Sequence, residues 1–111
     1  MSVALPVVYH PAYQAEWQAL PPPERAAMAT AVDKLRVDSQ LGFPHTSLAR
    51  GGRLGVRELR PRRGRSPGRR LYRRVGGVLV MLAVAPEAEK GRRGFETALA
   101  TAEARLGEVG E

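Results

Sequence analysis

Residues 50–74 read RGGRLGVRELRPRRGRSPGRRLYRR, and this stretch holds eleven arginines but only one acid, Glu58. The whole chain has a formal net charge of +7, so the residues outside the stretch are net negative. Apolar residues such as Leu54, Leu71 and Tyr72 lie between the arginines, which indicates a folded β-hairpin and not a disordered basic tail. Such a concentration of positive charge is typical of a protein that contacts a polyanion. The alternative is a solvated hairpin whose arginines only keep the protein soluble.

The length and composition exclude several classes of protein. A chain of 111 residues predicts a single domain, residues 1–111. The absence of cysteine excludes disulfides and thiolate chemistry, and His10 and His45 are too isolated to suggest a zinc site. We therefore predict no metal and no cofactor. The longest apolar run, Val78–Ala85, is too short to span a membrane, and no signal-peptide pattern is visible, so we expect a cytoplasmic protein without a membrane partner.

Hydrophobic periodicity predicts the element order β-α-α-β-β-β-α. Pro6 suggests that the first strand lies at a sheet edge, and Val78–Ala85, apolar at both parities, is typical of an inner strand. The residues between Leu41 and Gly52 are expected to form a loop, Gly76-Gly77 a tight turn, and Gly107 a helix cap. The expected strands are Ala4–His10, Leu54–Pro61, Arg69–Val75 and Val78–Ala85, and the expected helices are Ala12–Leu20, Pro23–Gln40 and Phe95–Leu106.

This order predicts an α+β fold with a small antiparallel-dominated sheet. The apolar stripes of the helices need a surface to cover, and we expect them to pack mainly on one face of the sheet. The other face is then free for arginines. Residues of equal parity share a face of a strand, so Arg69 and Arg73 are expected to point the same way, and Arg57 away from Arg60 unless a bulge intervenes.

Several short motifs follow one another along the chain in a characteristic order. They are Leu41-Gly42-x-Pro44-His45, Gly55-Val56-Arg57-Glu58-Leu59-Arg60, Arg69-x-Leu71-Tyr72, an apolar strand ending near Lys90, and a last helix with Ala104-Arg105-Leu106. In this order and spacing the chain resembles the RelE/ParE superfamily of type II toxin–antitoxin toxins, and within it the HigB-like branch. The resemblance covers nearly the whole chain and implies a RelE-like fold.

The resemblance also implies a function and partners. HigB-like and RelE-like toxins are mRNA endonucleases, or mRNA interferases, that cut mRNA in the ribosomal A site and inhibit translation. The implied partners are the ribosome, mRNA and a cognate antitoxin, which in the HigB-like branch is typically a helix-turn-helix protein of the HigA kind. ParE toxins share the fold but inhibit DNA gyrase, so a gyrase inhibitor and a non-catalytic RNA-binding module stay open as alternatives.

Metal-independent cleavage through the 2′-OH of RNA requires proton removal, stabilisation of the phosphorane and protonation of the leaving oxygen. By resemblance, Arg57, Arg60 and Arg69 match the basic active surface of the family and Lys90 its terminal basic position, while Arg73 joins them by its parity with Arg69. Arginine is suited to clamping phosphate, and Lys90 is the better candidate for proton transfer. The predicted RNA-binding residues are six further arginines of this stretch, Arg53, Arg62, Arg63, Arg65, Arg70 and Arg74.

Three further residues have two interpretations each. Tyr72 is a core residue or a proton donor, and His45 is a loop residue or a catalytic one. Glu89 is an exposed loop acid or a base. Glu58 is expected to pair with a neighbouring hairpin arginine and to orient it.

Overall fold

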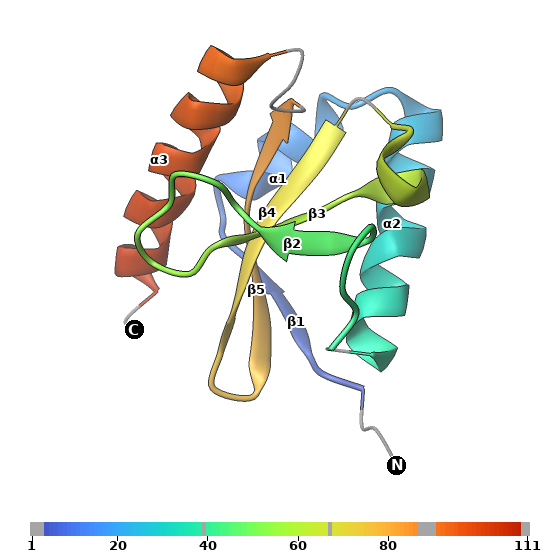
Figure 1. Ribbon diagram of the computed structural model, residues 1–111, viewed down its shortest axis with the longest axis horizontal. Helices are drawn as coiled ribbons and strands as arrows, with labels where there is room; N and C mark the ends of the chain where they lie inside the picture. Colours follow the sequence, from blue (N-terminus) through green and yellow to red (C-terminus); the bar gives the residue numbers. More distant parts are fainter. Residues whose placement is uncertain (1–3, 39, 67, 87–90, 110–111) are drawn as a thin grey trace.

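The computed structural model describes residues 4–38, 40–66, 68–86 and 91–109 (Figure 1). The predicted α+β class is confirmed by three helices and a five-stranded mixed sheet among these residues. In chain order the elements are β1 (Val7–Tyr9), α1 (Tyr13–Gln18), α2 (Pro22–Val37), β2 (Thr46–Leu48), β3 (Arg57–Leu59), the 3-10 turn η1 (Pro61–Gly64), β4 (Gly68–Val75), β5 (Val78–Pro86) and α3 (Arg92–Glu108).

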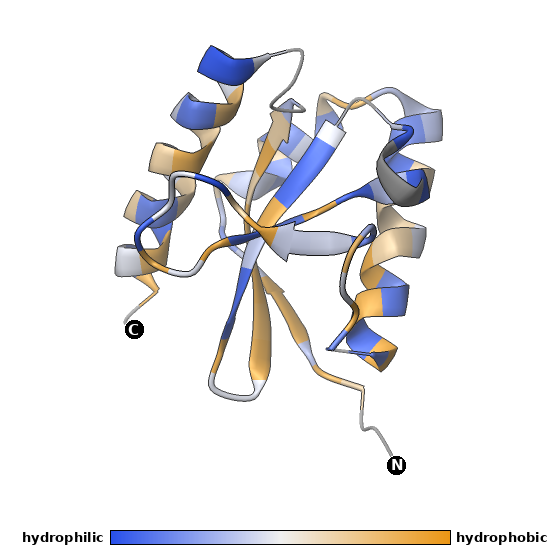
Figure 2. Ribbon diagram, viewed as in Figure 1, coloured by the Kyte–Doolittle hydropathy of each residue, from blue (hydrophilic) through white to orange (hydrophobic). Residues whose placement is uncertain are grey.

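The strand β5 is the centre of the core. In the sheet order β1-β5-β4-β3-β2, it pairs in parallel with β1 and antiparallel with β4, and the remaining pairs are antiparallel. All residues from Leu79 to Ala83 are buried, which confirms the predicted inner strand. Figure 2 shows β5 in the colours of apolar residues, whereas much of β4 is hydrophilic. The first strand lies at the sheet edge, as Pro6 suggested.

Side chains of β5 enter two apolar clusters on opposite faces of the sheet. Val80 and Leu82 pack against α3, whereas Leu79 and Met81 pack against α1 and α2. Figure 1 shows α3 and α2 on opposite sides of the strands. The expected one-sided packing therefore holds for α1 and α2 only. Because β5 is apolar on both sides it needs cover on both, so α3 covers the face that was expected to be free for arginines.

The region before β4 differs most from the expectation. Residues 41–52 are not a continuous loop, because β2 pairs antiparallel with β3 from Thr46 opposite Leu59 to Leu48 opposite Arg57. The strand β3 is also shorter than expected, because it covers only three of the eight residues of the predicted strand Leu54–Pro61. Strands of three residues contain too little alternation to be recognised in a sequence.

The turns and helix ends follow their local chemistry. Gly76 has φ +60° in the tight turn between β4 and β5, as the Gly-Gly pair predicted. The predicted cap at Gly107 is wrong, because α3 continues to Glu108 and Val109 follows as its cap. Oε2 of Glu108 lies 3.5 Å from His10 Nε2.

Candidate functional site

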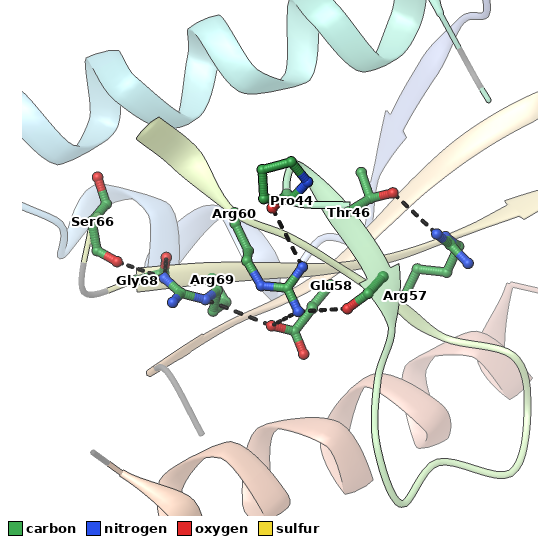
Figure 3. Close-up of polar contacts among 9 residues, drawn as sticks. Pro44, Thr46, Arg57, Glu58, Arg60, Ser66, Gly68 and Arg69 are labelled. Carbon is green, nitrogen blue, oxygen red and sulfur yellow. Dashed lines mark hydrogen bonds and ion pairs between the residues drawn. The ribbon is translucent and has the colours of Figure 1, made fainter. Parts of the chain in front are cut away.

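One buried carboxylate gathers two arginines on the α3 face of the sheet. Arg60 Nη2 lies 3.2 Å from Glu58 Oε1, and Arg69 Nε lies 3.6 Å from the same oxygen (Figure 3). The predicted pairing of Glu58 with a hairpin arginine is thus confirmed, and two arginines share it. We call Glu58, Arg60 and Arg69 the Glu58 cluster.

The register of three strands places the Glu58 cluster. Glu58 lies opposite Ser47 of β2 and Leu71 of β4, and Leu71 packs with the residues of α3. Arg69 is two residues before Leu71 on β4 and so shares its face. Arg60 directly follows β3, and its backbone N–H donates to the His45 carbonyl over 2.8 Å. The cluster therefore depends on β2, which the sequence did not reveal.

Arg60 is the accessible member of the Glu58 cluster. Its side chain is 18% exposed, and its guanidinium donates to Ser47 Oγ over 2.5 Å and to the Pro44 carbonyl over 3.5 Å. It also lies over the ring of Phe43, 5.6 Å from the ring centre. Phe43 is itself 82% exposed. Sequence reasoning missed Phe43 and Ser47; the only signal was an aromatic residue set between Gly42 and Pro44.

Arg69 is held inside the protein. Its residue is 4% exposed, and Nη1 donates to the Ser66 carbonyl over 2.5 Å and to the Gly68 carbonyl over 3.0 Å. Together with the contact to Glu58, these bonds compensate the buried charge. Arg69 therefore anchors the turn before β4 and positions Glu58 and Arg60.

Two hollows meet at Arg60. The first, about 510 Å³, lies between β2, β3 and α3 and is lined by Phe43, Glu58, Arg60, Arg50, Arg92 and Phe95, among others. The second, about 700 Å³, lies beside α2 and η1 and contains Lys34, His45, Arg60, Arg62 and Arg65 in its lining. We call the first hollow the α3 groove. The positive charge at these hollows suits a phosphate backbone.

The other predicted catalytic residues do not all join the Glu58 cluster. Arg57 extends away from it and donates to Thr46 Oγ1 over 3.0 Å (Figure 3). Successive side chains of a strand point to opposite faces, so Arg57 shares a face with Leu59 and not with Glu58. Leu59 packs on the α2 side. Arg73 is partly exposed, lies beside Gly55 and shares parity with Arg69. Lys90 and Glu89 lie outside the described residues.

The predicted RNA-binding arginines also separate. Arg53, Arg65 and Arg74 are exposed. The loop at Arg53 is held to α3, because the backbone N–H groups of Arg53 and Leu54 donate to Glu103 Oε2 over 2.6 and 3.2 Å. The side chain of Arg63 lies outside the described part of the structure.

Arg62 binds the turn to α2. It donates to Glu24 Oε2 over 2.7 Å and to Ser66 Oγ over 3.0 Å, and it adopts φ +53°. The hydrogen bond from Arg62 holds the pKa of the Glu24 carboxyl below its ordinary value. Part of the Arg62 side chain stays exposed at the hollow beside α2.

Arg70 was predicted to bind RNA, and this is wrong. It is 2% exposed and lies on the α1 face, with its guanidinium 4.9 Å from the ring centre of Tyr13 and 4.8 Å from that of Trp17. Burial lowers the pKa of Arg70 and raises that of the Tyr13 hydroxyl. Strand alternation explains the error, because Arg70 must point away from the face of Arg69.

The two open interpretations within the described residues have different outcomes. Tyr72 is buried with Leu59 and Met81, so the core interpretation is confirmed. His45 is half-buried at the edge of the hollow beside α2, and its catalytic role stays a prediction. Among the described residues, no group of His, Cys, Asp or Glu side chains has a metal-binding arrangement, and no helix is long and apolar enough to cross a membrane.

Solved structures share this arrangement of strands and helices. A mutant of the E. coli toxin RelE in the free state, with two arginines changed to alanine, matches with a TM-score of 0.63. The match covers 88% of this chain and 96% of that one, at 13% identity. The chain has the RelE fold. The toxin–antitoxin complex RelBE2 from Mycobacterium tuberculosis also matches, with a TM-score of 0.58 and 22% identity over 77% of this chain and 100% of that one.

The RelE fold is thus shared at low sequence identity. No protein-family model matches the sequence, and no curated protein sequence matches it significantly. The RelE-like fold expected from the motifs is confirmed. The order of helices and strands along the chain follows the expected one except for the additional strand β2.

Proposed function

We propose that this protein is the toxin of a type II toxin–antitoxin system and an endoribonuclease that cuts mRNA on the ribosome. One observation carries the proposal: on a RelE fold, the α3 groove presents Arg60, fixed by Glu58 and Arg69, beside the exposed ring of Phe43. A positioned guanidinium suits a phosphorane, and an exposed aromatic ring suits stacking of an unpaired base. The motifs further suggest the HigB-like branch.

In the proposed reaction the 2′-oxygen of RNA attacks the adjacent phosphorus. The 2′-O–H proton leaves, the 2′-O–P bond forms, the bond from phosphorus to the 5′-oxygen breaks, and that oxygen takes up a proton. The role of Arg60 is to stabilise the charge on the phosphorane oxygens, and that of Arg69 and Glu58 is to hold Arg60 in place. Lys90 stays the predicted group for proton transfer.

A cognate antitoxin belongs to the proposal. The RelBE2 structure is a toxin–antitoxin complex, and a chain with the same fold and a net charge of +7 suits an acidic partner. We expect a helix-turn-helix protein of the HigA kind. Co-purification of this chain with the product of a neighbouring gene, followed by mass spectrometry, tests that part separately.

The burial of Arg69 favours a second candidate, a non-catalytic toxin of the ParE kind that inhibits gyrase. A guanidinium that is tied to the Ser66 and Gly68 carbonyls does not reach a substrate phosphate without breaking those bonds. In that case the Glu58 cluster is a structural feature, and replacing Arg60 leaves the toxic effect intact.

Induced expression in bacterial cells separates the two candidates. Primer extension on translated mRNA is expected to show new 5′ ends within minutes of induction, while purified gyrase keeps its supercoiling activity. Arg60→Ala is expected to reduce cutting at least about 100-fold, as for other single groups that stabilise a transition-state charge. The control is Arg93→Ala, which removes an exposed arginine of α3. Growth arrest with intact transcripts and inhibited gyrase would replace the first candidate by the second.

A further inference from the structure

Arg70 is a buried cation that has no polar partner among the described residues. In the described part of the chain its guanidinium makes no hydrogen bond and no ion pair, and Nε is fully buried and unbonded. The hydroxyl of Tyr13 is also buried without a hydrogen bond there. The contacts that Arg70 does make are with the rings of Tyr13 and Trp17.

Aromatic contacts compensate only part of the cost of burying this charge. Stacking on a ring favours a guanidinium, but an unpaired buried charge normally has a carboxylate or several acceptors beside it. The adjacent Arg69 has both, with two carbonyls and Glu58. An acceptor that is not part of the described chain would complete the surroundings of Arg70 in the same way.

A cavity of about 470 Å³ leads to this guanidinium. Six of its ten lining residues are apolar or aromatic, and its volume is in the range of small-molecule sites. The lining includes Val7, Tyr9, Tyr13, Trp17, Val32 and Arg70. An acid and a second arginine also border the cavity, but they pair with each other at its mouth: Asp33 is 73% exposed and lies 3.7 Å from Arg36, which is 44% exposed.

We propose that this cavity binds a carboxylate on a short apolar chain, with Arg70 as the counter-ion. The carboxylate supplies acceptors for the guanidinium. Val7, Trp17 and Val32 contact the apolar chain. The carboxylate belongs either to a free organic acid or to the C-terminus of a protein chain. The proposal does not depend on the toxin function, because the cavity is on the face opposite the Glu58 cluster.

Trp17 is the chain's single tryptophan and so reports directly on this cavity. Its fluorescence is measured while the wild-type protein is titrated with sodium hexanoate at constant ionic strength. We expect a saturable change with a dissociation constant of roughly 1 mM, the range for a ligand of this size. Hexanamide, the neutral isostere, is expected to bind at least about tenfold more weakly. The reason is that the amide cannot form a charge-assisted contact with the guanidinium, and the loss of one such contact weakens binding roughly tenfold. Equal responses to both, or no saturable response to hexanoate, would overturn the proposal.

Variants of the counter-ion test its role. Arg70→Met keeps an apolar side chain in the stack, and we expect it to lose the hexanoate response. Arg93→Met, which removes one exposed positive charge elsewhere, is expected to bind like the wild type. Should Arg70→Met fail to fold by circular dichroism, Arg70→Lys keeps the charge but not the planar fork and should bind about tenfold more weakly. Unchanged binding by a folded Arg70 variant contradicts the assignment.

Competition with peptides distinguishes the two sources of the carboxylate. A short peptide that ends in leucine is added to the hexanoate complex, once with a free C-terminus and once amidated. Displacement by the free form alone supports a protein C-terminus as the ligand. Displacement by neither form, with hexanoate binding retained, supports a free acid. Displacement by the amidated form to the same extent shows that the carboxylate is not recognised, and the proposal fails.

Discussion

Arg69 and Arg70 are neighbours on β4, and both are buried, yet their surroundings have nothing in common. Arg69 faces α3 and binds two backbone carbonyls and the Glu58 carboxylate. Arg70 faces α1 and lies against two aromatic rings, with no polar partner among the described residues. One step along a strand reverses the face and therefore the chemistry of the same side chain.

The comparison shows what a charge count leaves out. The eleven arginines of residues 50–74 suggest one basic surface, but they serve at least three roles. Arg69 anchors a turn, Arg60 lies at two hollows, and Arg70 lies within the core. The positive charge available to a polyanion is thus smaller than the sequence implies.

The largest expected effect on stability comes from replacing Arg69, the arginine with polar partners. Arg69→Met removes two hydrogen bonds to carbonyls and leaves Glu58 with one fewer cation. We expect the free energy of unfolding to fall by about 3 kcal/mol, as when one partner of a buried ion pair is removed. Urea unfolding followed by circular dichroism measures this change. A loss below about 1 kcal/mol would show that Arg69 is not an anchor.

Removing the carboxylate makes the surroundings of Arg69 more like those of Arg70. Glu58→Met is expected to lower the free energy of unfolding by about 2 kcal/mol, because Arg69 keeps its carbonyl partners. The same urea titration checks it, with the exposed Glu96→Met as the matched control. If Glu58→Met unfolds like the wild type, the carboxylate does not hold the cluster together.

On the aromatic side the expected effect is small. Arg70→Met removes a charge that has no polar partner in the described part of the chain, so the free energy of unfolding should stay within about 1 kcal/mol of the wild type or rise. Unfolding is measured without added carboxylate and then with hexanoate, which should stabilise only the wild type. A large loss of stability without ligand would mean that stacking alone compensates the charge of Arg70.

The smallest effect concerns the contact between Arg62 and Glu24. The folded-state pKa of Glu24 is lowered, so its contribution to stability is present above the unfolded pKa and is lost as the pH falls through the folded value. Acid unfolding below about pH 4 should therefore show a slightly weaker pH dependence in Glu24→Gln. The two titration curves are compared by circular dichroism. Identical curves would show that the contact does not form in solution.

Sequence reasoning recovered the elements with strong patterns. The inner strand β5, the edge strand β1, the Gly-Gly turn and the three helices all follow from periodicity or turn chemistry. The pairing of Glu58 with arginine was also predicted. The strand β2 was missed because three residues contain no period, and with it the positions of Ser47 and Phe43 beside Arg60.

The burial and the contacts of individual arginines were harder to predict from the sequence. Parity separates Arg69 from Arg70, but it does not show which face is covered by which helix. That depends on α3, whose apolar stripe packs on the face expected to be free. The burial of Arg70 against Tyr13 and Trp17 brings together residues more than fifty positions apart, and no local pattern indicates such a contact.

The chemistry of the cut ends tests the central claim most directly. A cell-free translation reaction is supplied with the purified protein, and the 3′ end of each upstream mRNA fragment is analysed by mass spectrometry. The proposed attack by the 2′-OH predicts 2′,3′-cyclic phosphate ends with the wild type and Arg93→Ala, and at least about 100-fold fewer with Arg60→Ala. Fragments ending in a free 3′-OH, or translation that stops while the mRNA stays intact, would contradict it.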